Sequence, residues 1–116
     1  MGKVDENAFY IDVKDFLGNR IICCRERWDD HIANDLRNHN LEGLEKEVIR
    51  ALTKPSGGMR HHDTDFPERM SYYGRSSIAR YIKVSVEFND RKCIGTGRII
   101  TAYACSKMKP NEQPEF

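Results

Sequence analysis

The sequence lacks both a long apolar run and a dominant charge. None of the apolar segments in its 116 residues approaches the ~20 residues that a membrane-spanning helix needs. No hydrophobic block follows Lys3 at the start of the chain, so we expect no secretory signal, no membrane association and a cytoplasmic location. The 19 Lys and Arg nearly balance the 18 Asp and Glu. The total charge therefore argues neither for nor against a nucleic-acid partner, and any basic surface must be local.

The four cysteines lack the C-x-x-C spacing that is typical of structural zinc sites. Cys23 and Cys24 are neighbours, and in a strand their side chains would point to opposite faces, so we do not expect them to pair. Reduced, partly buried thiols are the interpretation that we favour. A zinc site assembled from scattered Cys and His is the alternative. The segment RHHDTD (60–65) places imidazoles beside carboxylates but follows no spacing rule for metal ligands, so we expect no bound metal.

The start and the second half of the chain follow the two-residue period of β-strands. Alternating apolar residues in FYIDV (9–13), followed by the turn-like DFLGN and by RIICC (20–24), predict an N-terminal β-hairpin. Further strands are predicted for RMSYYG (69–74), for YIKVSVEF (81–88) and for residues 94–105, which would return antiparallel after a turn.

Two short amphipathic helices are predicted between these strand segments. Trp28, Ile32 and Leu36 recur every four residues and would form one apolar stripe. A second stripe runs through residues 41–52, and Pro55 with the following glycines would end that helix.

Helices followed by antiparallel strands are typical of an α+β domain. We therefore predict an N-terminal hairpin and two helices packed on one face of a three- to four-stranded antiparallel sheet. A single domain would span residues 1–105. Residues 106–116 contain two prolines and little to bury, so we expect them to form a flexible C-terminal tail.

The predicted sheet would leave one face uncovered. Thr101 and Tyr103 are two residues apart and would lie on that face, near Tyr81, Lys83 and Ser85 of the neighbouring strand. The side chains predicted to face the helices are Ile82, Val84, Val86, Phe88, Ile100, Ala102 and Ala104. Rings that stack on bases and a lysine that meets phosphate would suit RNA. Antiparallel sheets also often have one solvated face that binds nothing, and this alternative stays open.

Two fragments resemble parts of one nuclease group. RERWDDHI (25–32) is similar to the W-x-x-H-I opening of a helix, and RIITAY (98–103) is similar to the closing strand, of the bacterial and phage domains gathered as barnase–EndoU–colicin–RelE-like nucleases. Between the fragments, a helix ending at a proline, an arginine before Tyr72-Tyr73 and a hydrophobic strand follow in the same order. The resemblance covers roughly residues 25–105. The sequence differs from this group at two places. It has His39-Asn40 where such domains often have His-Pro, and Ala104 where they have a proline after Thr-Ala-Tyr.

The resemblance implies a toxin-like endoribonuclease that uses no metal and no other cofactor. In such enzymes the ribose 2′-OH attacks the adjacent phosphate, which requires a base, an acid and cations around the phosphorane. The implied partners are RNA (tRNA or mRNA) and a cognate antitoxin or immunity protein. A non-catalytic RNA- or protein-binding domain of the same fold is the alternative.

Four residues are candidates for the catalytic site. His31 is the leading acid–base candidate because imidazole titrates near neutral pH. Arg69 is the choice for phosphate because a guanidinium is always charged and can bind two oxygens. The resemblance adds Thr101 as a donor to a phosphoryl oxygen and Tyr103 as a stacking group or weak acid.

The substrate-binding candidates are Arg75, Tyr73, Lys83 and His39. Arg80 and Arg98 are rivals of Arg69 for the phosphate. For every one of these residues, an ordinary surface or strand position is the alternative to a functional role.

Overall fold

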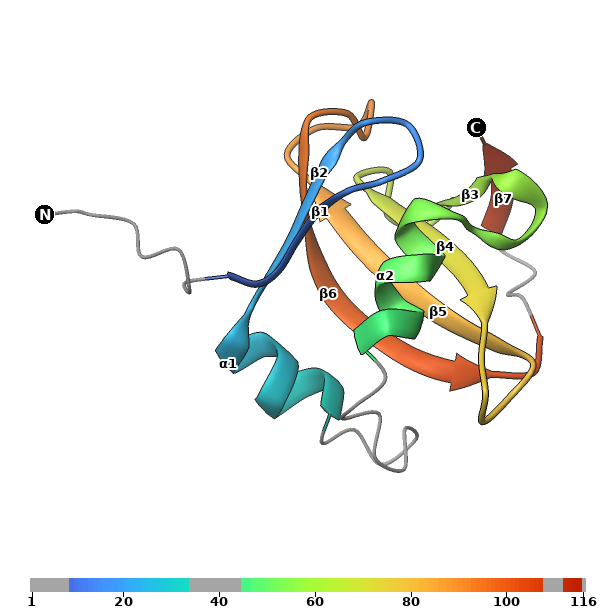
Figure 1. Ribbon diagram of the computed structural model, residues 1–116. Helices are drawn as coiled ribbons and strands as arrows, with labels where there is room; N and C mark the ends of the chain where they lie inside the picture. The colour runs from blue at the N-terminus through green and yellow to red at the C-terminus, as the bar shows by residue number, and fades with distance from the viewer. Residues whose placement is uncertain (1–8, 34–44, 108–111, 116) are drawn as a thin grey trace, which may run out of the picture.

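The computed structural model of the protein describes residues 9–33, 45–107 and 112–115. The strands are β1 (Phe9–Lys14), β2 (Arg20–Cys24), β3 (Arg60–Asp63), β4 (Arg69–Arg75), β5 (Tyr81–Phe88), β6 (Thr96–Cys105) and β7 (Glu112–Glu115). The helical elements are α1 (Arg25–Arg27), its π-helical continuation η2 (Trp28–Ala33), α2 (Glu45–Thr53) and the 3₁₀ turn η3 (Ser56–Gly58). All seven strands form one sheet in the order β1-β2-β6-β5-β4-β3-β7, with α2 lying across it (Figure 1).

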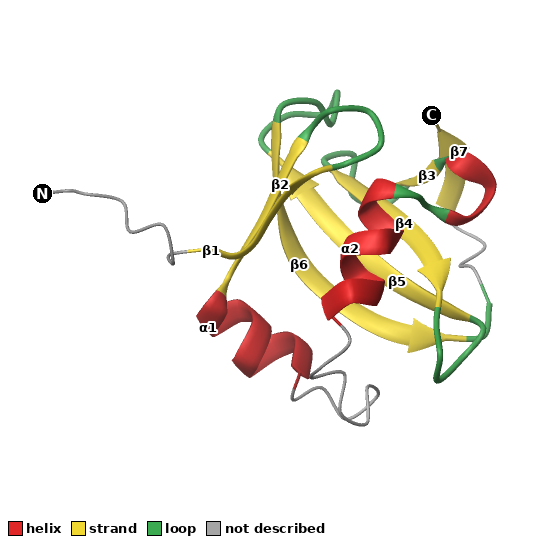
Figure 2. Cartoon of the chain, viewed as in Figure 1, coloured by secondary structure: helices red, strands yellow, loops and turns green. Residues whose placement is uncertain are grey.

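The predicted architecture of two helices on a three- to four-stranded antiparallel sheet is wrong. The sheet has seven strands and is mixed, because β2 runs parallel to β6. Strands dominate the described residues and the helices are short (Figure 2). The prediction failed because it treated the hairpin as a separate element, whereas the pairing of Arg20–Ile22 with Thr96–Arg98 makes the hairpin part of the sheet.

The edge of the sheet opposite the hairpin is extended by two strands with polar sequences. β3 pairs antiparallel with β4 although its sequence, RHHD, shows no apolar alternation. Within the segment expected to be a loose tail, Glu112–Glu115 forms β7 and pairs antiparallel with β3. Backbone ladders, which no side-chain pattern records, therefore account for both strands.

Several individual elements agree with their predictions. The N-terminal hairpin is confirmed by the antiparallel pairing of β1 with β2. The strand predicted for residues 81–88 is β5 with the same bounds, and α2 ends at Thr53, just before Pro55. Trp28 and Ile32 are buried in η2 as the first helical stripe predicted, whereas Leu36 and Leu41 lie outside the described residues.

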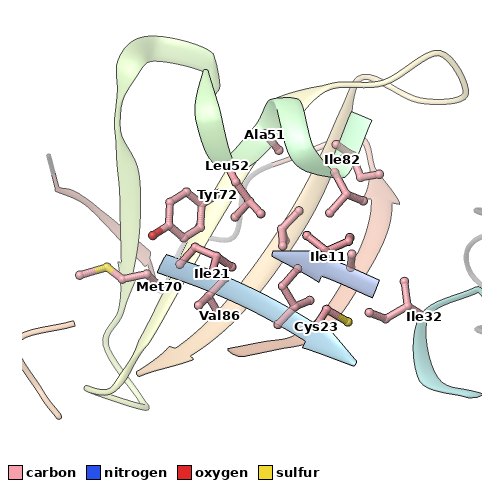
Figure 3. Close-up of a cluster of buried hydrophobic side chains, with 14 of the residues drawn as sticks. Ile11, Ile21, Cys23, Ile32, Ala51, Leu52, Met70, Tyr72, Ile82 and Val86 are labelled. Atoms are coloured by element: carbon pink, nitrogen blue, oxygen red, sulfur yellow. The ribbon is translucent and has the colours of Figure 1, made fainter. Parts of the chain in front are cut away.

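The hydrophobic core lies between the sheet and the helical elements (Figure 3). Its members come from the hairpin, η2, α2 and the central strands and include Ile11, Ile21, Cys23, Trp28, Ile32, Val48, Ala51, Leu52, Met70, Tyr72, Ile82, Val84, Val86, Phe88, Ile99 and Ala102. The helix approaches β4 very closely, since a Cβ placed on Gly74 would lie 2.8 Å from the Cβ of Ala51. Glycine at residue 74 therefore permits this contact.

A β-bulge in β6 changes which residue enters the core. Ser85 pairs with Thr101 whereas Val86 pairs with Ile99, so Ile100 is the extra residue. Ile99 is buried in the core in place of Ile100, which corrects the predicted set. Thr101 and Tyr103 lie on the face opposite α2, as the two-residue period predicted.

A buried polar network joins the hairpin turn to β3 and β4. One carboxylate oxygen of Asp15 accepts hydrogen bonds from the backbone N–H groups of Leu17 (2.9 Å) and Asn19 (2.8 Å), and the other accepts one from the hydroxyl of Tyr72 (2.6 Å). Arg60 Nη1 donates to the Tyr72 hydroxyl (3.3 Å) and lies 3.9 Å from Asp15 Oδ2. Burial, followed by the hydrogen bond to Asp15, raises the pKa of Tyr72. The network fixes the hairpin turn against the strands that carry the site described below.

None of the helices in the described residues has the length and apolar character needed to cross a membrane.

Candidate functional site

Polar and aromatic side chains of β4, β5 and β6 line the sheet face opposite α2, which we call the second face. Because these strands are antiparallel, residues directly opposite one another form rows across them. Along β5 the rows are Arg75, Tyr81 and Cys105; Tyr73, Lys83 and Tyr103; Ser71, Ser85 and Thr101; and Arg69, Glu87 and Arg98. The second face thus has arginines at both ends and a row of hydroxyls between its lysine and its carboxylate.

The centre of the second face is buried rather than open. Tyr73, Lys83 and Tyr103 are 0%, 3% and 9% exposed. Lys83 Nζ lies 5.9 Å from the centroid of the Tyr73 ring and 5.8 Å from that of the Tyr103 ring. His61 and Tyr81 pack edge-on against Tyr73, at centroid distances of 5.1 and 5.9 Å. The expected uncovered platform is therefore corrected: these rings enclose the lysine, so they present little surface on which a base could stack.

The row of Arg69, Glu87 and Arg98, which we call the Arg–Glu–Arg row, lies next to Thr101. Arg69 Nε donates to Glu87 Oε2 at 3.4 Å, and the Arg69 guanidinium lies over the Phe66 ring at 4.2 Å. Arg98 is exposed and has no ion pair within the described part of the chain. One guanidinium of this row is thus held by the carboxylate, whereas the other is available to a ligand.

A pocket of about 350 Å³, which we call the β2–β6 pocket, opens between these two strands beside the Arg–Glu–Arg row. Its lining includes Phe9, Ile22, Cys24, Arg27, Glu87, Arg98 and Ile100. The parallel ladder ends at Ile22 and Arg98, and β6 then bulges at Ile100. Arg27 Nη1 donates to the Ile100 carbonyl oxygen at 3.5 Å, which anchors α1 to β6 one residue before Thr101. Apolar walls with two guanidiniums and one carboxylate can accommodate an anionic ligand that also has an apolar part.

The structure brings five of the predicted site residues together on the second face. These residues are Arg69, Tyr73, Lys83, Thr101 and Tyr103. Arg75 lies at the other end of this face, exposed and opposite Tyr81. His31 belongs to η2, which packs against β6, but its side chain is outside the described residues. His39 lies outside the described residues altogether.

Sequence reasoning missed Glu87 and Arg27. The signal for Glu87 was present, because residues 83, 85 and 87 share one face of a strand with a two-residue period. Arg27 carried no comparable signal, since its approach to β6 depends on where β2 and β6 separate. Arg98 was considered only as a rival for the phosphate, and its place beside Glu87 follows from the strand register.

The described residues contain no group of three or more His, Cys, Asp or Glu side chains placed to hold a metal ion. All four cysteines are thiols. Cys23 is buried, and burial raises the pKa of its thiol to about 12. Cys24 is exposed, and its Sγ accepts a hydrogen bond from Arg27 N at 3.4 Å. Within the described ranges, therefore, no set of zinc ligands can be named.

The fold and the site together define a small mixed-sheet protein whose second face bears arginines and hydroxyls. Comparisons with protein-family models, with curated proteins and with solved structures found no match to this chain.

Proposed function

We propose that this protein is a metal-independent, toxin-type endoribonuclease that cleaves tRNA or mRNA through attack of the ribose 2′-OH on the adjacent phosphate. The observation that carries the proposal is the position of Thr101 next to the Arg–Glu–Arg row on the second face. Neighbouring rows are ~7 Å apart along the strands, and neighbouring strands are ~4.8 Å apart. A single phosphodiester can therefore lie between the hydroxyl and the guanidiniums. The resemblance of residues 25–32 and 98–103 to the nuclease group supports the same function.

The proposed roles follow from the chemistry of each group. Arg69 and Arg98 neutralise the charge that develops on the phosphorane, and Thr101 donates a hydrogen bond to one of its oxygens. Arg69 engages Glu87 through Nε alone, which leaves its Nη atoms for the phosphate. Tyr103, which is 9% exposed, serves as a weak acid behind Thr101 rather than as a stacking surface. His31 exchanges protons with the attacking or leaving oxygen.

The path of α1 and η2 supports a place for residue 31 near this site. Arg27 donates a hydrogen bond to the carbonyl oxygen of Ile100, which directly precedes Thr101. Residue 31 follows Arg27 by about one helical turn, on a segment that packs against β6.

RNA cleavage in the presence of EDTA tests the proposal. Wild-type protein should cleave total tRNA or mRNA with the chelator present, leaving 2′,3′-cyclic phosphate ends. His31→Ala should lower the cleavage rate at least ~100-fold, the usual contribution of one acid–base group, and Arg69→Ala and Thr101→Ala should lower it as well. Arg50→Ala is the matched control, because Arg50 is an exposed arginine of α2, on the other face of the sheet. Full activity of Thr101→Ala, or cleavage that disappears with EDTA, would contradict the proposal.

A non-catalytic RNA- or protein-binding domain is the second candidate. The burial of Tyr73, Lys83 and Tyr103 favours it, because a substrate can reach only the ends of the second face directly. Tight binding of RNA without cleavage of any RNA would support this alternative.

The proposal extends to the setting in which the enzyme acts. We place it in the cytoplasm, where tRNA and mRNA occur, and expect a cognate antitoxin or immunity protein to bind over the arginines of the second face. Expression should then be toxic to cells, and Arg69→Ala or Thr101→Ala should relieve the toxicity. Variants as toxic as the parent would remove these residues from the site.

A further inference from the structure

A second pocket lies at the other end of the second face, where β4 ends and β5 begins. Its volume is about 430 Å³, and it is lined by Ser56, Arg75, Ser76, Arg80 and Tyr81. We call it the β4–β5 pocket. This size falls within the range of ordinary ligand sites, and it exceeds what a single phosphate group fills.

The charge of the β4–β5 pocket is positive. Its lining contains two guanidiniums and no carboxylate. Arg75 and Arg80 are both exposed, and neither has an ion pair within the part of the chain that the structure describes. An anion entering this pocket therefore does not have to displace a carboxylate from either arginine.

The loop that carries the pocket is fixed to α2. Glu47 accepts hydrogen bonds from Ser77 N (3.1 Å) and from Ser77 Oγ (2.6 Å). The Ser76 hydroxyl accepts one from Ile78 N (3.2 Å) and can still donate its own hydrogen. Glu47 is thus engaged in holding the loop. A loop that is already held in place loses less conformational entropy when a ligand binds.

The β4–β5 pocket is continuous with the second face through Tyr81. Arg75 lies directly opposite Tyr81, and the Arg80 guanidinium lies over the Tyr81 ring at 5.5 Å. Tyr81 in turn packs edge-on against Tyr73. At ~3.3 Å per residue along β5, the distance from Tyr81 to Glu87 in the Arg–Glu–Arg row is about 20 Å. A single-stranded nucleic acid segment of several nucleotides can span that distance.

We infer that the β4–β5 pocket binds a backbone phosphate of single-stranded RNA, several nucleotides away from the bond that is cut. Arg75 and Arg80 supply charge-assisted hydrogen bonds to the phosphate oxygens. Ser56 and Ser76 add hydroxyl donors, and the half-buried Tyr81 ring supports the adjoining base or ribose. The choice of RNA as the ligand rests on the proposed function.

Salt-dependent binding tests the pocket separately from catalysis. The probe is a single-stranded oligonucleotide with 2′-O-methyl groups throughout, which binds as RNA but lacks the attacking hydroxyl. Kd is measured over a series of salt concentrations. The slope of log K against log salt should fall in magnitude by about 0.7 for each phosphate that a variant no longer neutralises. Arg75→Ala/Arg80→Ala should show this fall with an increased Kd. Lys46→Ala/Arg50→Ala removes the same charge from exposed positions of α2, on the other face of the sheet, and should keep the parent slope.

Substrate length provides the second measurement. A dinucleotide contains the cut bond but is too short to reach the β4–β5 pocket, so the loss of kcat/KM caused by Arg75→Ala/Arg80→Ala should be smallest on this substrate and should grow with the length of the RNA. The same variant should have a lower kcat/KM on a longer RNA.

The possible outcomes separate the pocket from the proposed function. If the parent cleaves RNA but the salt slope is unchanged in Arg75→Ala/Arg80→Ala, the β4–β5 pocket does not bind RNA phosphate, and the proposed ribonuclease function still stands. A reduced slope without cleavage of any RNA supports the pocket and overturns the catalytic proposal. Failure of the parent to bind the oligonucleotide overturns both.

Discussion

At the scale of single residues, Arg60 illustrates how burial decides the importance of an ion pair. The side chains of Arg60 and Asp15 are 3% and 0% exposed and are bridged by the Tyr72 hydroxyl. The Arg20–Asp12 pair is shorter, at 2.7 Å, but its side chains are 49% and 42% exposed. Water screens the second pair, whereas removal of one member of the first leaves a buried charge without compensation.

Arg60→Met should therefore destabilise the protein far more than Arg20→Gln. We expect a loss of about 3 to 5 kcal/mol for the buried position and little change for the exposed one, whose charges water screens. Urea unfolding followed by the fluorescence of Trp28, the sole tryptophan, measures both values. A loss for Arg20→Gln as large as that for Arg60→Met would contradict the view that burial decides the importance of the two pairs.

At the scale of elements, the contact of α2 with β4 depends on one glycine. A Cβ at Gly74 would lie 2.8 Å from the Cβ and 2.9 Å from the Cα of Ala51. Neither strand nor helix can yield easily, because Ala51, Leu52 and the residues beneath them are fully buried. The separation of the two elements is set here by the absence of a side chain.

Gly74→Ala should destabilise the protein by about 1 to 3 kcal/mol through overpacking. Ala51→Gly should cost about 1 kcal/mol from helix propensity. In the double variant the Cβ–Cβ clash is absent although the 2.9 Å approach to the Ala51 Cα remains, so its loss should be somewhat smaller than the sum of the two single losses. Strict additivity in urea unfolding would mean that the Cβ–Cβ clash is not part of the cause.

The elements also show what could be predicted from sequence and what could not. β5 was predicted with its bounds because Ile82, Val84, Val86 and Phe88 alternate with polar residues. β3 and β7 were missed because their strand character lies in backbone pairing, not in side-chain periodicity. The parallel pairing of β2 with β6 joins segments that lie far apart in the chain, and no local pattern encodes it.

The candidate site, like the fold, could be predicted from the sequence only in part. The two-residue period correctly placed Lys83, Thr101 and Tyr103 on one face. It gave no information on burial, which depends on how rings from several strands pack, so the enclosure of Lys83 was not foreseen. The bulge at Ile100, which shapes the β2–β6 pocket, likewise has no signature in the sequence.

At the scale of the whole molecule, folding raises the pKa of two tyrosines and a cysteine in the described part of the protein: Tyr10, Tyr72 and Cys23. The hydrogen bond to Glu45, with burial, raises the pKa of Tyr10 from 10.0 to about 12. Burial raises the pKa of Cys23 from 9.0 to about 12, and burial with the hydrogen bond to Asp15 raises that of Tyr72. Each pKa is higher in the folded than in the unfolded state, so the stabilisation is complete below about pH 9 and is lost as the pH rises towards 12.

Alkaline pH should therefore lower the urea midpoint. We expect little change up to about pH 9 and a progressive fall from there towards about pH 12, the window set by these pKa values. Tyr10→Phe should show a smaller fall than the parent, because it lacks one of these three ionisable groups, whose pKa values are raised on folding. A midpoint that stays constant through this range would contradict the assigned shifts.

The parallel junction of β2 with β6 also has a consequence for the order of folding. β4, β5 and β6 follow one another in the chain, so their antiparallel pairing closes only short loops, whereas Arg20–Ile22 must find Thr96–Arg98 across most of the domain. We therefore expect these three strands to assemble first and the hairpin to dock late. Until it docks, the outer edge of β6 offers unpaired backbone groups to any other chain. Newly made copies would then be most prone to strand exchange during the interval before the β2–β6 pocket exists.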